Sequence, residues 1–205
     1  MKKTIICNIP MKETVDKSVY EGEDKSVEVS NRAVMYPINA FIEKNATEED
    51  ELKIILLLKK DEIGHFHQNR IAFEEELKEV NASIGSKIEM VVLETDFSQE
   101  KTVHEQLMGK IVDEIDNGSH IIVDITYGPK DLPIIIFTAL GFAEKFLECE
   151  VDAIIYGQAS FVDGHVVNTK ICDMSPLYYL SSVTNTIKCD EPEKARKALK
   201  SLLSL

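Results

Sequence analysis

Five short apolar segments, each typical of a buried β-strand, are separated along this chain by segments with helical periodicity. They lie at residues 4–9, 53–58, 87–93, 120–125 and 151–156. Their apolar side chains are nearly continuous rather than alternating, which is typical of strands covered on both faces. Strands and helices in strict alternation predict a parallel sheet between two helical layers. We therefore predict an α/β fold, a Rossmann-like domain with a mainly parallel sheet and helices on both faces.

The segments between the strands carry helical patterns. Predicted helices span residues 32–45, 69–80 and 131–147, and another runs to about residue 115 from N-cap candidates at residues 96–99. Pro37 is expected in the first turn of the first helix. The helix that runs to about residue 115 has one apolar stripe with a four-residue repeat, formed by Val103, Leu107, Ile111 and Ile115. In the second, Ile71, Leu77 and Val80 are predicted to share a buried face.

The two ends of the chain depart from this alternation. Residues 12–30 are charged and weakly patterned, which indicates a loop with room for a short hairpin. Residues 161–167 carry Asp163-Gly164, a dipeptide favoured in tight turns, and predict a hairpin of antiparallel edge strands. Two helical segments follow, at residues 176–187 and 193–203. We therefore divide the chain into a domain at residues 1–175 and a C-terminal helical segment at residues 176–205.

Composition excludes several classes of protein. A net charge of −13 argues against binding of long nucleic acid, which usually needs an extended basic surface, but it leaves room for a small anion. The apolar runs are too short to span a bilayer, and the N-terminus lacks a signal peptide, so we expect a cytoplasmic protein without a membrane partner. The sequence contains neither a Rossmann dinucleotide fingerprint nor a P-loop, and its cysteines are scattered. We expect no cofactor and no metal.

The turn after the fourth strand is the most informative candidate for a ligand site. In open parallel sheets, ligands bind beyond the carboxyl ends of the strands. Here Gly128 allows close approach of the backbone, Thr126 offers a hydroxyl, Tyr127 an aromatic ring and Lys130 a positive charge. The start of the next helix also favours an anion. A turn that needs glycine and Pro129 only for its geometry is an equal alternative at this point.

Two motifs resemble those of CRISPR-associated Rossmann-fold (CARF) domain proteins of type III CRISPR systems. The first is Val123-Asp-Ile-Thr-Tyr-Gly-Pro-Lys-Asp-Leu-Pro133, where that family has Asp-(Ile/Val)-Thr-His-Gly and a later Leu-Pro. The second is Asp173-Met-Ser-Pro-Leu-Tyr-Tyr-Leu180, which is similar to the start of the family's helix after the hairpin. The resemblance covers about half of the chain closely. Over the N-terminal strand and its loop it concerns layout alone.

The resemblance implies a homodimer that senses cyclic oligoadenylate, with the cyclic tetra-adenylate favoured over the hexa-adenylate. A two-fold axis suits a ring of identical nucleotides because each side chain is presented twice. The implied ligand-binding residues are Asn8, Ile9, Pro10 and Met11 after the first strand and Thr126, Tyr127, Gly128, Pro129 and Lys130 after the fourth. Gln158 and Ser160, after the fifth strand, are further candidates for contacts with adenine edges, and Arg32 and Tyr36 are weaker ones.

The chain departs from the family at Tyr127, where histidine is common, and at Pro129-Lys130. Some members cleave their ligand without a metal, and Lys130 is then the candidate catalytic residue, stabilising charge on the phosphoryl oxygens. The alternatives are therefore a sensor, a metal-independent ring nuclease, and a dimeric regulator that binds an unrelated nucleotide. Family members usually carry an effector domain, and residues 176–205 are expected either to lead to one or to end a stand-alone protein.

Overall fold

An interior strand of the sheet, β1 (Lys2–Asn8), pairs in parallel with β5 (Glu51–Lys59) on one side and β7 (His120–Asp124) on the other. The computed structural model describes residues 1–13, 15–60, 65–96, 98–162, 165–186 and 188–203. The other strands are β2 (Ser18–Val19), β3 (Glu21–Gly22), β4 (Ala33–Val34), β6 (Lys87–Thr95), β8 (Glu150–Val162) and β9 (His165–Asp173). The helices are α1 (Pro37–Asn45), α2 (Phe66–Ile84), α3 (Lys101–Glu114), α4 (Leu132–Phe146), α5 (Ser175–Thr186) and α6 (Pro192–Leu202).

The strand order of the main sheet is β3-β9-β8-β7-β1-β5-β6. From β1 the chain proceeds outward through β5 to β6, then returns to the other side of β1 and proceeds outward through β7 to β8. The order therefore reverses between β1 and β7, a position called here the switch point. In such sheets the crevice at the switch point is the usual place for a ligand. The predicted Rossmann-like α/β fold is confirmed.

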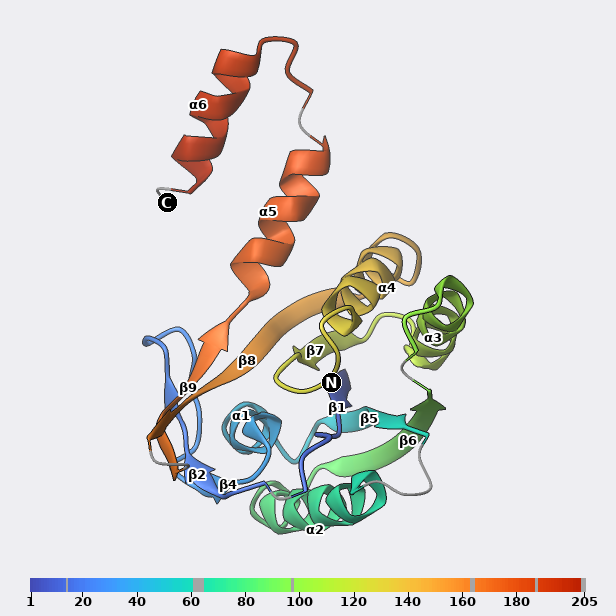
Figure 1. Cartoon of the computed structure of the whole chain (residues 1–205), viewed down its shortest axis with the longest axis vertical. Coiled ribbons are helices and arrows are strands. Elements are labelled where there is room, and N and C mark those ends of the chain that lie inside the picture. Colours follow the sequence, from blue (N-terminus) through green and yellow to red (C-terminus); the bar gives the residue numbers. More distant parts are fainter. Residues whose placement is uncertain (14, 61–64, 97, 163–164, 187, 204–205) are drawn as a thin grey trace.

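Helices cover both faces of the sheet, as predicted (Figure 1). Along β5, Ile54, Leu56 and Leu58 pack with α1 and α2, whereas Ile55 and Leu57 pack with α3 and α4. Successive strand side chains point to opposite faces, so a strand between two helical layers must be apolar at every position. This arrangement accounts for the continuous apolar runs in the sequence.

The predicted stripe of α3 is largely confirmed, since Leu107, Ile111 and Ile115 are buried. The prediction for α2 was wrong at Ile71, whose side chain is 44% exposed. Phe73 occupies the buried face instead, together with Leu77 and Val80. Residues 73, 77 and 80 follow the spacing of one helical face, whereas residue 71 lies well away from it.

The segment before α1 also differs from the prediction. The helix begins at Pro37 rather than at residue 32, with the proline in its first turn as expected. Residues 33–34 are extended and form β4, which pairs with β2 in a small antiparallel sheet. The neighbouring β3 pairs in parallel with β9. The described strands of the charged N-terminal segment therefore pair with β4 and β9 rather than with each other, and β3 is the outermost strand of the main sheet.

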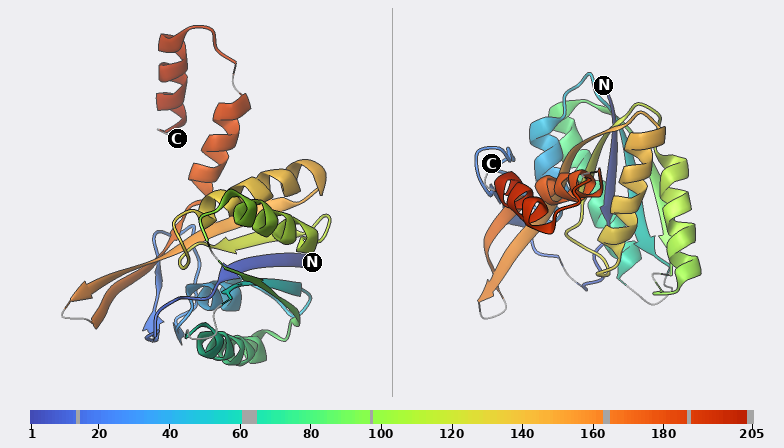
Figure 2. Two further views of the ribbon diagram at one scale, coloured as in Figure 1. Left: turned by 45° about the vertical axis from the view of Figure 1, so that its right-hand side comes forward. Right: turned by 90° about the horizontal axis from the view of Figure 1, so that it is seen from above.

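β8 is longer than predicted and continues past Tyr156 to Val162. Beyond its contact with β7 it pairs with β9 in antiparallel fashion, which confirms the antiparallel pairing predicted near the C-terminus. Residues 156–162 and 165–172 form an extended two-stranded element, here called the arm, which projects past the carboxyl end of β7 (Figure 2). The predicted turn residues Asp163 and Gly164 lie outside the described residues.

The two C-terminal helices extend away from the sheet (Figure 1). Tyr178 of α5 packs edge-on against Phe137 of α4, with ring centroids 5.4 Å apart, and its hydroxyl donates to the Glu144 carboxylate at 2.6 Å. By contrast, α6 has no buried residue. Within the described part of the chain, no helix combines the length and apolar character needed to cross a membrane.

Candidate functional site

The structure brings together the two loops that the sequence placed after the first and fourth strands. β1 and β7 are parallel neighbours, with Ile6 opposite Val123, so Asn8 lies beside the start of the β7–α4 turn. A Cβ atom added to Gly128 would lie 2.9 Å from the Asn8 amide nitrogen. Residues more than a hundred positions apart in the sequence thus meet at the switch point.

Asp124, the last residue of β7, holds the β7–α4 turn in place through hydrogen bonds. Its buried carboxylate accepts hydrogen bonds from the backbone N–H of Thr126, at 2.8 Å, and from the Ile38 N–H in the first turn of α1. Burial raises the pKa of Asp124 to about 6, although these hydrogen bonds act in the opposite direction. Asp124 therefore joins the β7–α4 turn to the beginning of α1.

Thr126 uses its hydroxyl within the protein. The hydroxyl donates to Asp124 and accepts a hydrogen bond of 2.7 Å from the backbone N–H of Gly157 in the arm. A hydroxyl has a single proton to donate, so only acceptor capacity remains for a ligand. Its first role is to fix the position of the turn relative to the arm.

Gly128 is required by the backbone. Its φ of +112° lies where residues with a side chain are strained. A Cβ atom there would also lie 2.7 Å from Leu132 Cδ2. Only glycine therefore lets the turn pass this close to Leu132 and to β1. This structural role is compatible both with a ligand site and with a turn that serves geometry alone.

Tyr127 points toward the N-terminal segment and is half-buried. Its hydroxyl donates to the Met35 carbonyl at 3.1 Å, and its ring stands edge-on to Tyr36 at 6.3 Å. Burial, followed by the neighbouring Tyr20 and Asp124, raises the pKa of this phenol. With Tyr20 and Gly157 it lines a cavity of about 210 Å³. The ring is thus held in place by the protein and presents part of its surface to a cavity.

Lys130 is exposed immediately before α4. Among the described residues, no carboxylate forms an ion pair with it, whereas its neighbour Asp131 lies 2.6 Å from His104 Nε2. Pro129 accepts the N–H of Leu132 and begins the helical turn. A lysine without a protein counter-ion at a helix N-terminus is well placed to meet an anion.

The four predicted residues at the end of β1 and just after it divide into two kinds. Ile9 and Pro10 bury their side chains, and the Pro10 carbonyl accepts a 3.0 Å hydrogen bond from Asn69. Met11 is exposed. Asn8 is only 4% exposed, and its amide oxygen has no hydrogen-bond partner among the described residues. Buried polar atoms are usually hydrogen bonded, so this oxygen is an acceptor available at the switch point.

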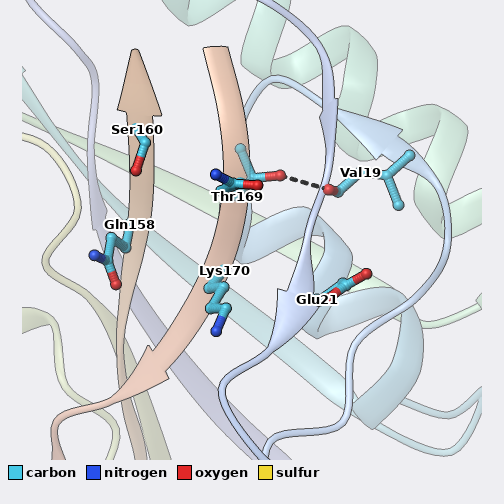
Figure 3. Close-up of a pocket in the computed structure, with 7 residues that line it drawn as sticks. Val19, Glu21, Gln158, Ser160, Thr169 and Lys170 are labelled. Atoms are coloured by element: carbon cyan, nitrogen blue, oxygen red, sulfur yellow. Dashed lines mark hydrogen bonds between the residues drawn. The ribbon is translucent and has the colours of Figure 1, made fainter. Parts of the chain in front are cut away.

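Gln158 does not face the same cavity as Tyr127. It lines a separate hollow of about 590 Å³ on the arm together with Ser160 and Lys170 (Figure 3). Adjacent residues of a strand point to opposite faces, so Gly157 faces the turn and Gln158 faces away from it. The two weaker candidates have other partners: the Tyr36 hydroxyl donates to the Asn69 carbonyl, and Arg32 pairs with Glu43.

Sequence reasoning missed Glu76, which is almost fully buried on α2. Its carboxylate accepts hydrogen bonds from the backbone N–H groups of Met35 and Tyr36, at 2.7 and 3.1 Å, and from the Asn39 amide. Glu76 and Asp124 thus both accept hydrogen bonds from residues at or just before the beginning of α1. Nothing distinguishes Glu76 in the sequence, because it ends a run of three glutamates typical of a solvated face.

A group of side chains that could bind a metal ion lies at the opposite end of the sheet. Potential ligand atoms of His120, Glu150 and Asp152 lie within 4.8 Å of one another. His120 is already hydrogen bonded to Asp152 at 2.8 Å. A register shift between β7 and β8 brings the two acidic residues to one histidine, which the sequence does not reveal. The group is remote from the switch point.

Comparison with known proteins gives one informative similarity. No family model matches the chain. It is 25% identical over 182 residues to the CRISPR-associated protein MJ1674 of Methanocaldococcus jannaschii. The alignment covers 82% of this chain and 27% of that protein, so the chain spans about a quarter of the length of this relative.

Proposed function

We propose that this chain is the sensor domain of a CRISPR-associated protein and binds cyclic oligoadenylate at the switch point. The observation that carries the proposal is the convergence of the unpaired Asn8 amide oxygen and the β7–α4 turn at one place in the sheet. The distant similarity to a CRISPR-associated protein supports the same class of function. The resemblance of residues 123–133 to the CARF motif supplies the identity of the ligand.

The chemistry of the crevice suits a nucleotide. Lys130 and the beginning of α4 favour a phosphate, in spite of the acidic character of the chain as a whole. The Asn8 oxygen is an acceptor that an adenine amino group or a ribose hydroxyl can satisfy. The backbone of the Gly128 turn approaches closely because no side chain intervenes. These are the groups that we assign to ligand contact.

The proposal includes a homodimer. Exposed apolar side chains lie along α4, with Ile134 near the turn and Phe142 further along the helix. Large apolar residues on an exposed helix face favour contact with a partner. A two-fold axis near the turn would place two copies of Asn8 and Lys130 around one ring. The cyclic tetra-adenylate remains our first choice of ligand.

Titration calorimetry with cyclic tetra-adenylate, cyclic hexa-adenylate and linear tetra-adenylate tests the proposal. We expect tight binding of one cyclic ligand, with one ring per two chains. Lys130→Ala should weaken binding about tenfold or more, because a phosphate contact is lost. Lys101→Ala is the matched control, since it removes the same charge at the start of α3 and should leave affinity unchanged. If neither ring binds, a regulator of an unrelated nucleotide becomes the better assignment.

A second candidate function is a metal-independent ring nuclease, favoured by the charge of Lys130, with which no carboxylate of the described residues forms an ion pair. In this reaction a ribose 2′-oxygen attacks the adjacent phosphorus, the bond to the 5′-oxygen breaks, and a 2′,3′-cyclic phosphate and a 5′-hydroxyl result. Lys130 would stabilise the phosphoryl oxygens as charge develops. Incubation of the labelled ring with pure protein in a chelator distinguishes the two functions. Bound ligand that stays intact for hours identifies a sensor alone.

A further inference from the structure

Side chains of β7 and β8 gather at the amino end of these two parallel strands, away from the crevice at the switch point. His120 begins β7 and is the Cα partner of Glu150, which begins β8. Potential ligand atoms of His120, Glu150 and Asp152 all lie within 4.8 Å of one another. At about 3.3 Å per residue, β7 separates His120 from Asp124 by a distance on the order of 13 Å. The group is therefore separate from the site assigned to the nucleotide.

An irregularity in the pairing of the two strands brings the third side chain to this group. Val151 pairs with Ile121 and Ala153 pairs with Ile122, so Asp152 is an extra residue without a Cα partner in β7. Such a β-bulge changes the direction of a side chain relative to a regular strand. The Asp152 carboxylate lies 2.8 Å from the His120 ring nitrogen Nδ1. The bulge thus places two carboxylates beside one imidazole.

The backbone that carries the group is held by other parts of the protein. The Glu150 N–H donates to the Ser119 carbonyl at 3.2 Å, and the hydroxyl of Ser119 accepts a buried hydrogen bond of 2.9 Å from Thr4. From α5, the Tyr179 hydroxyl donates to the Val151 carbonyl at 2.5 Å. Side chains on fixed strands hold a binding geometry better than side chains on loops. The three donors are therefore positioned before any ion binds.

The two carboxylates have no basic partner to balance their charge. Within the described part of the chain, no lysine or arginine forms an ion pair with Glu150 or Asp152. Lys3 is the Cα partner of His120 in β1 and lines a cavity together with Asp152, but its ammonium is paired with Asp50 at 2.9 Å. Like charges that converge without a counter-ion repel each other, and a bound cation relieves this repulsion.

The donor set indicates which kind of ion would bind. Zn²⁺ accepts imidazole nitrogen and carboxylate oxygen at bond lengths of about 2.0–2.2 Å, and three protein ligands leave its fourth position for water. Mg²⁺ prefers oxygen ligands in an octahedral arrangement, so the imidazole disfavours it. Ligand atoms of a tetrahedral zinc site lie about 3.3 Å apart. Because Glu150 and Asp152 are exposed, their side chains can move from the present spacing to this one.

We propose that His120, Glu150 and Asp152 bind one Zn²⁺ ion per chain, with water in the fourth position. The ion joins β7 to β8 at the amino end of the two strands. It stabilises the folded protein, because only folding brings the three ligands together. The proposal requires neither cyclic oligoadenylate nor a dimer. Its failure would leave the proposed function unaffected, and the failure of that function would leave the metal site unaffected.

Calorimetric titration of the chelator-treated, tag-free chain with zinc chloride tests the site. Every protein carries Cys172→Ser and Cys189→Ser, because thiols that are not buried can also bind zinc. We expect one saturable site per chain, and no such site for magnesium chloride. Glu150→Gln should raise the dissociation constant about tenfold or more, because a charged ligand is lost. The matched control is His104→Ala, since this histidine pairs with a carboxylate but belongs to no group of three potential ligands among the described residues.

NMR with Co²⁺ in place of Zn²⁺ locates the bound ion. Its unpaired electrons should broaden most strongly the amide signals of residues 119–121 and 150–152, and far less those of the β7–α4 turn. His120→Ala should remove this pattern. Since Glu150 is exposed, Glu150→Gln should fold normally, and its unfolding midpoint should no longer rise with zinc concentration as that of the parent does. The proposal is overturned if no saturable zinc binding occurs, if Glu150→Gln binds zinc as the parent does, or if the strongest broadening lies elsewhere.

Discussion

The backbone N–H of Gly157 donates a hydrogen bond of 2.7 Å to the Thr126 hydroxyl, and through it the β7–α4 turn is joined to the arm. The same hydroxyl donates to Asp124, which also accepts the N–H of Ile38. Three elements that are distant in the sequence therefore meet at one threonine and one aspartate. A displacement of the β7–α4 turn would therefore disturb hydrogen bonds to both α1 and the arm.

Replacement of Thr126 by valine removes this junction while keeping the shape of the side chain. We expect the free energy of unfolding to fall by about 1–3 kcal/mol, because the N–H of Gly157 and the Asp124 carboxylate each lose a partner. Amide exchange followed by NMR should show faster exchange at Gly157. Thr126→Ser retains the hydroxyl and should retain the protection. Unchanged exchange at Gly157 in the valine variant would contradict the prediction.

The raised pKa of Asp124 predicts an unusual dependence of stability on pH. Its folded pKa of about 6 lies above the ordinary value of 3.8, so the folded state holds a proton that the unfolded state has lost. The contribution is complete below about pH 4 and disappears as the pH rises through 6. The difference is on the order of 3 kcal/mol by linkage.

Urea denaturation of Asp124→Asn between pH 4 and pH 6.5 tests this sign. The variant should lack the decline that the unmodified protein shows over this interval, because a neutral amide cannot ionise. Asp113→Asn, which alters an exposed carboxylate on α3, should preserve the decline. The same decline in Asp124→Asn would show that another group is responsible.

Gly128→Ala should destabilise the protein, by about 1–3 kcal/mol, because the alanine must adopt a positive φ. The added Cβ atom would also displace Leu132 or Asn8. Gly109→Ala, in the middle of α3, should have the opposite effect, since its Cβ meets no atom within 4 Å and alanine is the better helix former. Chemical denaturation measures the free energy of unfolding of both variants. Equal changes would contradict the claim that the backbone at Gly128 requires glycine.

Asp50 and Lys3 form an ion pair of 2.9 Å whose side chains are 6% and 11% exposed. Burial alone would raise the pKa of Asp50, but hydrogen bonds from Lys3 and Thr47 outweigh it and lower the pKa to about 2. The stabilisation is therefore present above about pH 4 and lost as the pH falls through 2.

Removal of one partner of this ion pair should lower the free energy of unfolding more than replacement of both partners by apolar residues. Asp50→Ala leaves the buried Lys3 ammonium with the Asn45 carbonyl but without its carboxylate, and is expected to lower the free energy of unfolding by about 3 kcal/mol. Lys3→Met/Asp50→Leu should recover most of the loss. Thermal denaturation at pH 7 compares the three proteins. A double variant as unstable as Asp50→Ala would contradict this account.

The sequence predicts the parts of the structure that depend on local pattern. Runs such as Ile54–Leu58 reveal doubly covered strands, and from these follow the parallel sheet and the crevice beyond its carboxyl edge. The sequence also points to the turn containing Gly128. It does not reveal that Ile71 faces solvent, because phase along a helix is ambiguous when apolar residues are few. Nor does the sequence reveal that Gln158 faces away from the β7–α4 turn, because the orientation of its side chain depends on the continuation of β8 past Tyr156.

The interior position of β1 has a consequence for the order in which the molecule can assemble during synthesis. Its neighbours β5 and β7 are made later, and the pairing of Ile6 with Val123 spans more than half of the chain. The middle of the sheet therefore cannot close until β7 has left the ribosome, and pairings so distant in sequence form slowly. Until then the apolar residues of β1 are open to aggregation, so we expect the growing chain to depend on chaperones most strongly before residue 124 emerges.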